Sequence, residues 1–160
     1  MMTTILTASL WTATLSAGLM AGVFFAFSSF IMNALGERPP DEGLAAMRSI
    51  NRVILRSSFL PLFTFSSGLS LLLGGWAVWA WQSAAALPTL AGSLTYLLGM
   101  FACTGIFNVP LNEGLERAPA GEEATRFWKR YLKVWTRYNH SRTLASILSC
   151  GFFMAALLAS

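Results

Sequence analysis

The chain has 160 residues, of which 55% are hydrophobic and only 11% are charged. This balance excludes an ordinary soluble globular domain and indicates an integral membrane protein. The net charge of +4 is explained by contact with anionic headgroups, so we expect membrane lipids as partners and no nucleic acid.

The charged residues are confined to two windows of the sequence, residues 37–56 and 113–142. The segments outside these windows carry no charge: 1–36, 57–112 and 143–160. Because about 20 apolar residues cross a bilayer, the first segment has room for one span, the second for two and the third for one. The sequence therefore predicts an all-α fold, a four-helix transmembrane bundle in a single domain of residues 1–160.

The first predicted span covers residues 4–32. It is not a typical signal peptide, because it has no positively charged start and its apolar run is too long. Small residues recur at every fourth position along it: Thr14, Gly18, Gly22 and Ala26. Such a pattern lets another helix approach closely.

An amphipathic surface helix is predicted after two prolines end the first span. It begins at Asp41, and its apolar stripe consists of Leu44, Met47, Ile50 and Ile54. Arginines recur on another side of the same helix: Arg48, Arg52 and Arg56. Asn51 lies at the edge of the apolar stripe. Its spacing leaves two explanations open, an amide solvated at the membrane interface or an amide that points into the bundle.

The next two predicted spans are residues 58–81 and 88–111, separated by a tryptophan-rich turn. Near the end of the later span, Asn108 and Asn112 are four residues apart and therefore share a helix face. Pro110 between them has no N–H, so the carbonyl four residues earlier lacks its helical donor. We expect a kink or a polar partner at that point.

The last predicted span, residues 143–159, continues a helix that begins outside the membrane as a cytoplasmic extension. One face of this extension carries Trp128, Tyr131, Trp135, Asn139 and Arg142, and the opposite face carries Arg126, Lys129, Arg130, Lys133 and Arg137. His140 lies about 120° from Trp128 on a helical wheel, nearer the basic face. Arg142 either extends to lipid phosphates or holds a functional partner inside the bundle, and its position leaves both explanations open.

The distribution of cations between the spans predicts the orientation in the membrane. Four arginines lie between the first and second spans, seven lysines or arginines between the third and fourth, and none between the second and third. With four spans, both basic loops are on the same side. We therefore expect these loops in the cytoplasm and both termini outside. A homo-oligomer is compatible with the sequence.

Few residues in the chain are suited to binding a metal. There is one histidine and there are two cysteines, and Cys103 and Cys150 both lie in predicted spans. This set cannot build a Cys/His zinc site or a bis-histidine haem site within one chain. Neither a Glu-x-x-His pair nor a glycine-rich nucleotide motif occurs. We therefore expect no metal and no cofactor.

Several stretches of the chain together carry a family resemblance. They are Asn108-Val-Pro-Leu-Asn112, Trp128-x-x-Tyr131-x-x-x-Trp135-Thr136-x-x-Asn139-His140-x-Arg142-Thr143, Phe27-Ser28-x-Phe30-Ile31-Met32 and Ala46-Met47-x-x-Ile50-Asn51. With them the chain resembles, over nearly its whole length, the anthrone oxygenase-like family of small four-helix membrane proteins. Most of that family is catalogued as a domain of unknown function. A minority of its members oxidise anthrones to anthraquinones.

This resemblance implies a cofactor-independent oxygenase that acts on an anthrone-like or other flat aromatic or quinone-type molecule. His140 would be the catalytic base that removes the benzylic proton, and Arg142 with Asn108 or Asn112 would stabilise the resulting oxyanion. The substrate-binding residues would be Asn51, Asn108, Asn112, Trp128, Tyr131, Trp135 and Asn139.

A second hypothesis is a non-catalytic membrane protein in which the same polar cluster is structural or binds lipid. In that case the amides and Arg142 would lock the third and fourth helices together. A small-molecule transporter is disfavoured, because the chain has only four predicted spans and no ionisable residue at a predicted midplane.

Overall fold

The computed structural model describes residues 2–119 and 121–160, and over these residues it is helical without any strand, as predicted. In chain order the elements are α1 (Met2–Ala26), the π-helical turn η1 (Phe27–Ile31), α2 (Met32–Gly36), α3 (Pro40–Ile54), α4 (Phe59–Trp79), α5 (Ala86–Leu94), the π-helical segments η2 (Thr95–Ala102) and η3 (Thr104–Asn108), α6 (Val109–Arg117) and α7 (Glu122–Leu158).

Within the described residues, four helices are long and apolar enough to cross a membrane: Thr4–Gly36, Phe59–Trp79, Ala86–Arg117 and Glu122–Leu158. The predicted helical fold with four membrane-length helices is confirmed. The 37 residues of α7 give it a length of about 55 Å. Because a hydrocarbon core is about 30 Å thick, nearly half of α7 extends beyond it, as expected for the predicted extension.

Two of these helices run further than the sequence predicts. The first continues to Gly36 instead of residue 32. The helix ends only where the chain approaches the two prolines at positions 39 and 40. The third continues to Arg117 instead of residue 111, and an i,i+4 ion pair between Glu113 and Arg117 at 2.6 Å supports the added turns. At Val109, one residue before Pro110, the helix changes from π to α register, and the Val109 N–H bonds the carbonyl five residues earlier.

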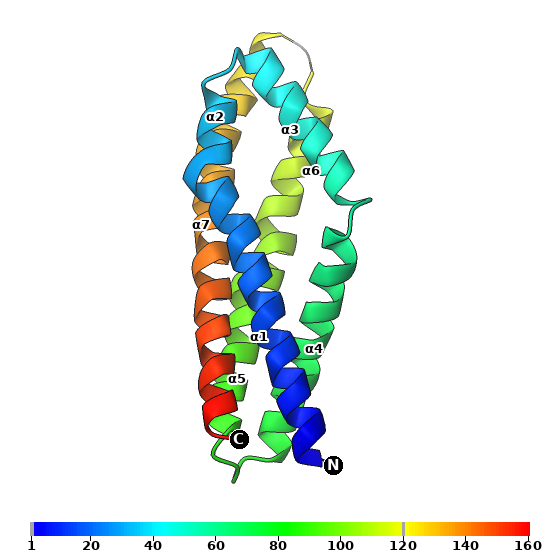
Figure 1. Ribbon diagram of the computed structural model, residues 1–160. Coiled ribbons are helices and arrows are strands. Elements are labelled where there is room, and N and C mark those ends of the chain that lie inside the picture. Colours follow the sequence, from blue (N-terminus) through cyan, green and yellow to red (C-terminus); the bar gives the residue numbers. More distant parts are fainter. Residues whose placement is uncertain (1, 120) are drawn as a thin grey trace.

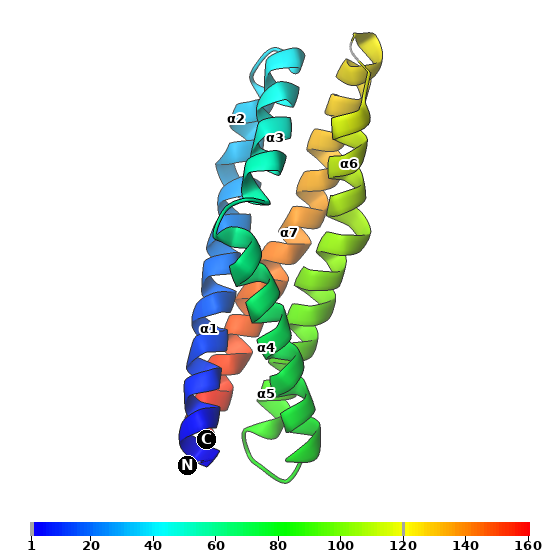
Figure 2. The same cartoon turned by 90° about the vertical axis from the view of Figure 1, so that its right-hand side faces the viewer.

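The four long helices run along one another with both chain ends at one end of the bundle (Figure 1). At the other end, α3 folds back along α2, and α4 then runs toward the chain ends (Figure 2). The two charged windows of the sequence, residues 37–56 and 113–142, therefore meet at the end opposite the termini, which we call the charged end.

The surface of the bundle is apolar around the spans, as expected of a membrane protein. Large side chains with at least 58% of their surface exposed include Leu15, Leu19, Leu72, Leu98 and Leu144. Close helix approach occurs at Gly92 and Gly99. A Cβ atom at these positions would lie 2.9 Å from Phe153 and 2.5 Å from Ala145.

The small residues that recur at every fourth position of α1 do not form the close helix contact that the sequence predicts. At Gly22 an added Cβ would meet nothing within 4 Å among the described residues, and at Gly18 it would meet only Cys150, at 3.8 Å. The buried side of α1 is a different stripe that includes Ala17, Met20 and Phe24, and these residues cluster with Tyr96 and Met100 of η2.

A hydrophobic cluster at the charged end fixes α3 against α7. Its buried members are Met32, Leu44, Met47, Leu115, Trp128, Tyr131 and Trp135. Gly43 makes this packing feasible, because a Cβ atom there would lie 2.5 Å from the Leu35 carbonyl oxygen and 3.0 Å from the Trp128 ring. This cluster forms the base of the candidate site.

Candidate functional site

Arg142 is buried in the bundle and is only 5% exposed. Its guanidinium lies between two aromatic rings, 4.4 Å from the centroid of Phe24 and 5.0 Å from that of Trp135. Its Nη2 donates to Oδ1 of Asn139 at 2.7 Å, and its Nη1 donates to Oγ1 of Thr104 at 3.4 Å. None of the ion pairs among the described residues includes Arg142. Cation–π contacts and neutral hydrogen bonds therefore stabilise the charge without neutralising it.

Asn139 fixes the position of Arg142 from α7 and α1 together. It is fully buried, and its Nδ2 donates to the Phe24 carbonyl and to Oγ of Ser28, both at 2.6 Å. Phe24 lies in the last turn of α1 and Ser28 lies in η1, so the two acceptors flank the point where the first helix changes to π register. Such π-helical turns are frequent at functional sites. Because the amide nitrogen is held by α1, the amide oxygen is oriented toward Arg142.

Three aromatic side chains stack in a column along α7. The ring centroids of Trp128 and Tyr131 are 5.7 Å apart, and those of Tyr131 and Trp135 are 6.0 Å apart. Oδ1 of Asn112 accepts hydrogen bonds from the Tyr131 hydroxyl at 2.7 Å and from Nε1 of Trp135 at 2.9 Å. One amide oxygen of α6 therefore orients the polar edges of two rings on α7.

A pocket of about 160 Å³ lies beside Arg142, between α1, α3, α4, α6 and α7. Asn51, Asn112 and Arg142 supply most of its polar lining. Aromatic rings form much of the remaining wall: Phe24, Phe27, Phe59, Phe63 and Trp135. The pocket thus combines one buried positive charge and two amides with flat apolar surfaces.

Two hydrogen-bond donors at this pocket have no partner among the described residues. They are Nδ2 of Asn51 and Nε of Arg142, and both are buried. An unpaired buried donor costs about 1–3 kcal/mol. A ligand with acceptor oxygens would remove this cost.

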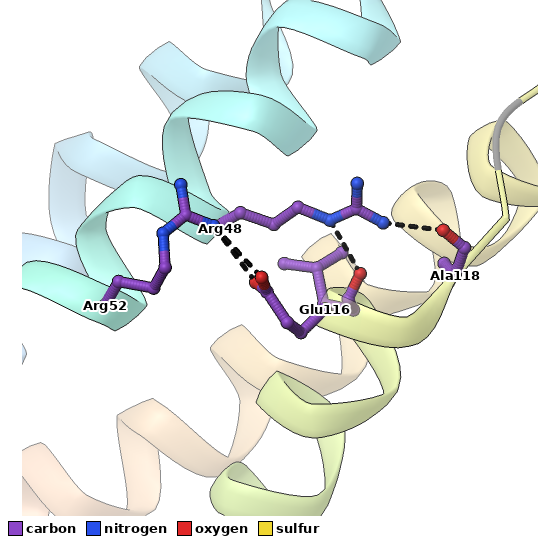
Figure 3. A network of polar contacts seen from close by, with 5 residues as sticks. Arg48, Arg52, Glu116 and Ala118 are labelled. Carbon is purple, nitrogen blue, oxygen red and sulfur yellow. Dashed lines mark hydrogen bonds and ion pairs between the residues drawn. The ribbon is translucent and has the colours of Figure 1, made fainter.

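Helix α3 covers the pocket at the charged end and is fastened to α6 by arginines (Figure 3). Nε of Arg48 donates to the Leu115 carbonyl at 2.9 Å, and its Nη2 donates to the Ala118 carbonyl at 2.7 Å. Arg52 forms an ion pair with Glu116 at 3.0 Å. The carbonyls at the end of a helix have no intrahelical donor. Arg48 therefore caps α6 and holds Asn51 over the pocket.

The mouth of the pocket faces the outer surface of the bundle, between α6 and the corner that joins α3 to α4. Its lining there includes Leu55, Leu60 and Val109, which are 62%, 39% and 41% exposed. These side chains are apolar and exposed at the level where the charged end meets the spans. A molecule that enters through this mouth therefore comes from an apolar surrounding.

The predicted site residues fall into three groups in the structure. The first group lines the pocket: Asn51, Asn112, Trp135 and Arg142. The second group does not line the pocket but contacts α7 or members of the first group: Asn108, Trp128, Tyr131 and Asn139. In this group, Nδ2 of Asn108 donates to the Trp135 carbonyl at 3.3 Å, and its Oδ1 has no partner among the described residues.

The third group is His140 alone, which the structure does not bring to the Arg142 pocket. His140 is exposed and lines a separate groove with Lys133 and Arg137. Its place on the helical wheel, near the basic face, agrees with this position. The functional role of each of these residues remains a prediction.

The sequence did not indicate three other residues of the pocket lining, namely Phe24, Phe27 and Thr104, of which Phe24 and Thr104 contact Arg142. The phenylalanines belong to a run whose spacing is explained by packing alone. Their relation to Arg142 arises across helices and leaves no local pattern. Only Phe27 could have been found, because it belongs to a stretch that carries the family resemblance.

Among the residues that the structure describes, no group of three His, Cys, Asp or Glu side chains is placed to hold a metal ion. A protein-family model described as Anthrone oxygenase matches residues 54–152, more than half of the chain. The match includes Asn112, Trp135, Asn139 and Arg142 but neither Asn51 nor the residues of α1. No curated protein and no solved structure matches the chain.

Proposed function

Because the chain belongs to the anthrone oxygenase family, we propose that it is an integral membrane oxygenase that binds a flat aromatic molecule beside Arg142. The observation that carries this proposal is the buried charge of Arg142, which lines a largely aromatic pocket and forms no ion pair among the described residues. A ligand with fused rings and an anionic oxygen would complement both properties. The rings would lie against aromatic walls, and the oxygen would accept from the guanidinium.

The polar groups of the pocket favour an oxygen acceptor over a donor. Nε of Arg142 and Nδ2 of Asn51 are unpaired donors, whereas Oδ1 of Asn112 already accepts two hydrogen bonds. A phenolate or enolate oxygen would pair with both free donors. A neutral hydrocarbon would leave them unpaired at a cost of about 1–3 kcal/mol each.

The proposed reaction converts a methylene flanked by aromatic rings into a carbonyl. Loss of one proton from an anthrone gives an enolate, whose negative oxygen would lie against Arg142. The enolate carbon then adds dioxygen to form a peroxide, and loss of water from the peroxide gives the quinone. One oxygen atom remains in the product and the other leaves as water, so one methylene group and one dioxygen molecule give one carbonyl group and one water molecule.

The role of Arg142 in this scheme is to favour the enolate at neutral pH. A buried positive charge interacts strongly with an adjacent anion because the surrounding dielectric is low. His140 lies in another groove, so no side chain is assigned as the base, and the proton would pass to a water molecule or hydroxide ion that enters from the charged end beside Asn51. This replaces the catalytic role that the sequence suggested for His140.

The size and mouth of the pocket favour a substrate that is dissolved in the membrane. Its volume of about 160 Å³ is below the ~300–1,000 Å³ typical of ligand pockets. A three-ring molecule would therefore place the edge that carries its oxygen inside and leave the rest between Leu60 and Val109 at the apolar mouth. In the membrane we place the charged end in the cytoplasm and both termini outside.

The alternative, a purely structural cluster, is favoured by one observation. Arg142 and Asn139 tie α7 both to α1 and to η3 through hydrogen bonds. In that case Arg142 would matter for stability and no aromatic molecule would bind. The two functions differ in whether the pocket takes up a ligand.

The test is a titration of the protein in lipid nanodiscs with 1,8-dihydroxyanthraquinone, whose phenolate absorbs visible light at longer wavelength than the phenol. We expect saturable binding to the wild type with a red shift, because Arg142 stabilises the phenolate. In Arg142→Met the apparent Kd should rise at least about tenfold, since a hydrogen bond to a charged group contributes about 1.5–3 kcal/mol.

Arg130→Met is the matched control, because it removes an exposed cation from the same helix and should leave the Kd within twofold. Circular dichroism must show that both variants keep their helices. Binding that is non-saturable, or equal in Arg142→Met and wild type, would favour the structural alternative.

A further inference from the structure

A second concave site lies on the opposite side of α7 from the Arg142 pocket. It is an open groove of about 650 Å³ between α2 and α7. Lys133, Arg137 and His140 line it from α7, and Asn33 and Glu37 line it from the other wall. The three α7 residues are spaced i, i+4 and i+7, so they form one face of the helix.

The cations of this groove are available to bind a ligand. The ion pairs of the described residues are Arg38–Glu42, Arg52–Glu116 and Arg117–Glu113, and none of them uses Lys133 or Arg137. Glu37 is the acidic residue of the lining, against the two cations Lys133 and Arg137. The groove therefore carries a net positive charge. In addition, Oγ1 of Thr136 in the same lining is buried without a partner in the described part of the chain.

The depth of the groove matches the headgroup layer. With Arg142 at the end of the charge-free segment, His140 and Arg137 lie about 3–8 Å further out along α7, and Lys133, about 14 Å out, can extend its long side chain back toward them. The headgroup layer of one leaflet is about 5–8 Å thick. On the membrane side, the same helix face continues with Leu144 and Ile147, which are 58% and 50% exposed. The face thus changes from cationic to apolar where a lipid changes from headgroup to acyl chain.

We propose that this groove binds an anionic phospholipid, with the phosphate beside Lys133, Arg137 and His140 and an acyl chain along Leu144 and Ile147. This inference does not depend on the proposed oxygenase function, because the groove is separate from the Arg142 pocket. It also gives His140 a role that fits its exposed position.

The experiment is native mass spectrometry of the detergent-solubilised protein titrated with phosphatidylglycerol, with phosphatidylcholine as the zwitterionic comparison. We expect one phosphatidylglycerol to bind more tightly than further copies and more tightly than phosphatidylcholine. In Lys133→Gln/Arg137→Gln, the affinity of that site should fall about twentyfold, since each cation near a membrane surface contributes roughly a fivefold factor.

The matched control is Arg126→Gln/Arg130→Gln, which removes two cations from the same face of α7. These residues lie about 18–24 Å from Arg142 along the helix, beyond the headgroup layer. The control should change the affinity less than about twofold. Equal losses in both double variants would mean diffuse attraction to the basic face and would overturn the proposal.

Two further outcomes are decisive. Glu37→Gln removes the acidic residue of the lining and should tighten phosphatidylglycerol binding by a few fold. Weaker binding in this variant would contradict an anionic ligand. Inorganic phosphate at millimolar concentration should fail to displace the lipid, because it lacks the acyl chain. Displacement by phosphate would show a soluble anion site instead.

Discussion

At the scale of single residues, one amide oxygen organises much of the candidate site. Oδ1 of Asn112 accepts hydrogen bonds from the Tyr131 hydroxyl and from Nε1 of Trp135. The ring of Trp135 in turn lies 5.0 Å from the Arg142 guanidinium. A single polar atom on α6 therefore orients the aromatic wall that packs against the charge, while Asn139 holds the charge itself.

Replacing Asn112 by leucine tests this arrangement. Two buried donors would lose their acceptor, and we expect the free energy of unfolding to fall by about 1–3 kcal/mol per unpaired group. The double variant Asn112→Leu/Tyr131→Phe should recover part of the loss, because it removes one of those donors. Thermal unfolding in detergent, followed by circular dichroism, measures both. An unchanged Tm in Asn112→Leu would show that the two hydrogen bonds contribute nothing.

A second residue-scale prediction concerns His140. Because its side chain is exposed in the groove with Lys133 and Arg137, His140→Ala should leave the Kd for 1,8-dihydroxyanthraquinone within twofold. The measurement is the same nanodisc titration. A loss of tenfold or more would restore the role as catalytic base that the sequence suggested.

The sequence predicted much of this residue pattern, because helical periodicity determines which side chains share a face. It placed Trp135, Asn139 and Arg142 on one stripe and His140 off it. It could not predict that Phe24 and Thr104 contact the guanidinium, since those contacts depend on how three helices pack. For Asn51, the structure distinguishes between the two explanations that the spacing left open, because its amide lines the pocket.

At the scale of elements, α3 acts as the cover of the pocket. Its amphipathic pattern predicted a surface helix with arginines on another side, and two of these arginines bind α6. The π-helical segments η1 and η2 left no local pattern in the sequence, whereas η3 ends beside Pro110, where the sequence predicted a kink or a polar partner.

The hydrogen bonds from Arg48 to the end of α6 lead to a prediction about hydrogen exchange in α3. Arg48→Met removes hydrogen bonds to the Leu115 and Ala118 carbonyls, each contributing about 1.5–3 kcal/mol because the donor is charged. Hydrogen exchange of the backbone amides of α3 should become at least about tenfold faster. Arg38→Met serves as the control, since it breaks only an exposed i,i+4 ion pair. Equal exchange rates in wild type and Arg48→Met would mean that packing alone holds α3.

At the scale of the whole molecule, the arrangement follows from where the charges are. The two charged windows meet at one end of the bundle and both chain ends lie at the other (Figure 1). Four membrane-length helices were predictable because uncharged segments of sufficient length are visible in the sequence. The exact ends of these helices were not predictable, because the run of apolar residues and the helix end at different residues.

The proposed orientation can be tested with fusions to the C-terminus. Alkaline phosphatase fused after residue 160 should be active, because that enzyme matures only outside the cytoplasm, whereas green fluorescent protein at the same place should be dark. The reverse pattern would place the termini inside and the basic loops outside, against the distribution of cations.

The most direct test of the central claim is turnover of a simple anthrone in nanodiscs, with oxygen uptake and quinone absorbance recorded together. Unsubstituted anthrone should be converted to anthraquinone with one dioxygen consumed per quinone formed, faster than in empty nanodiscs. Arg142→Met should lower this rate at least about tenfold, and Arg130→Met should not. A wild-type rate equal to that of empty nanodiscs, or an unchanged rate in Arg142→Met, would contradict an oxygenase site at Arg142.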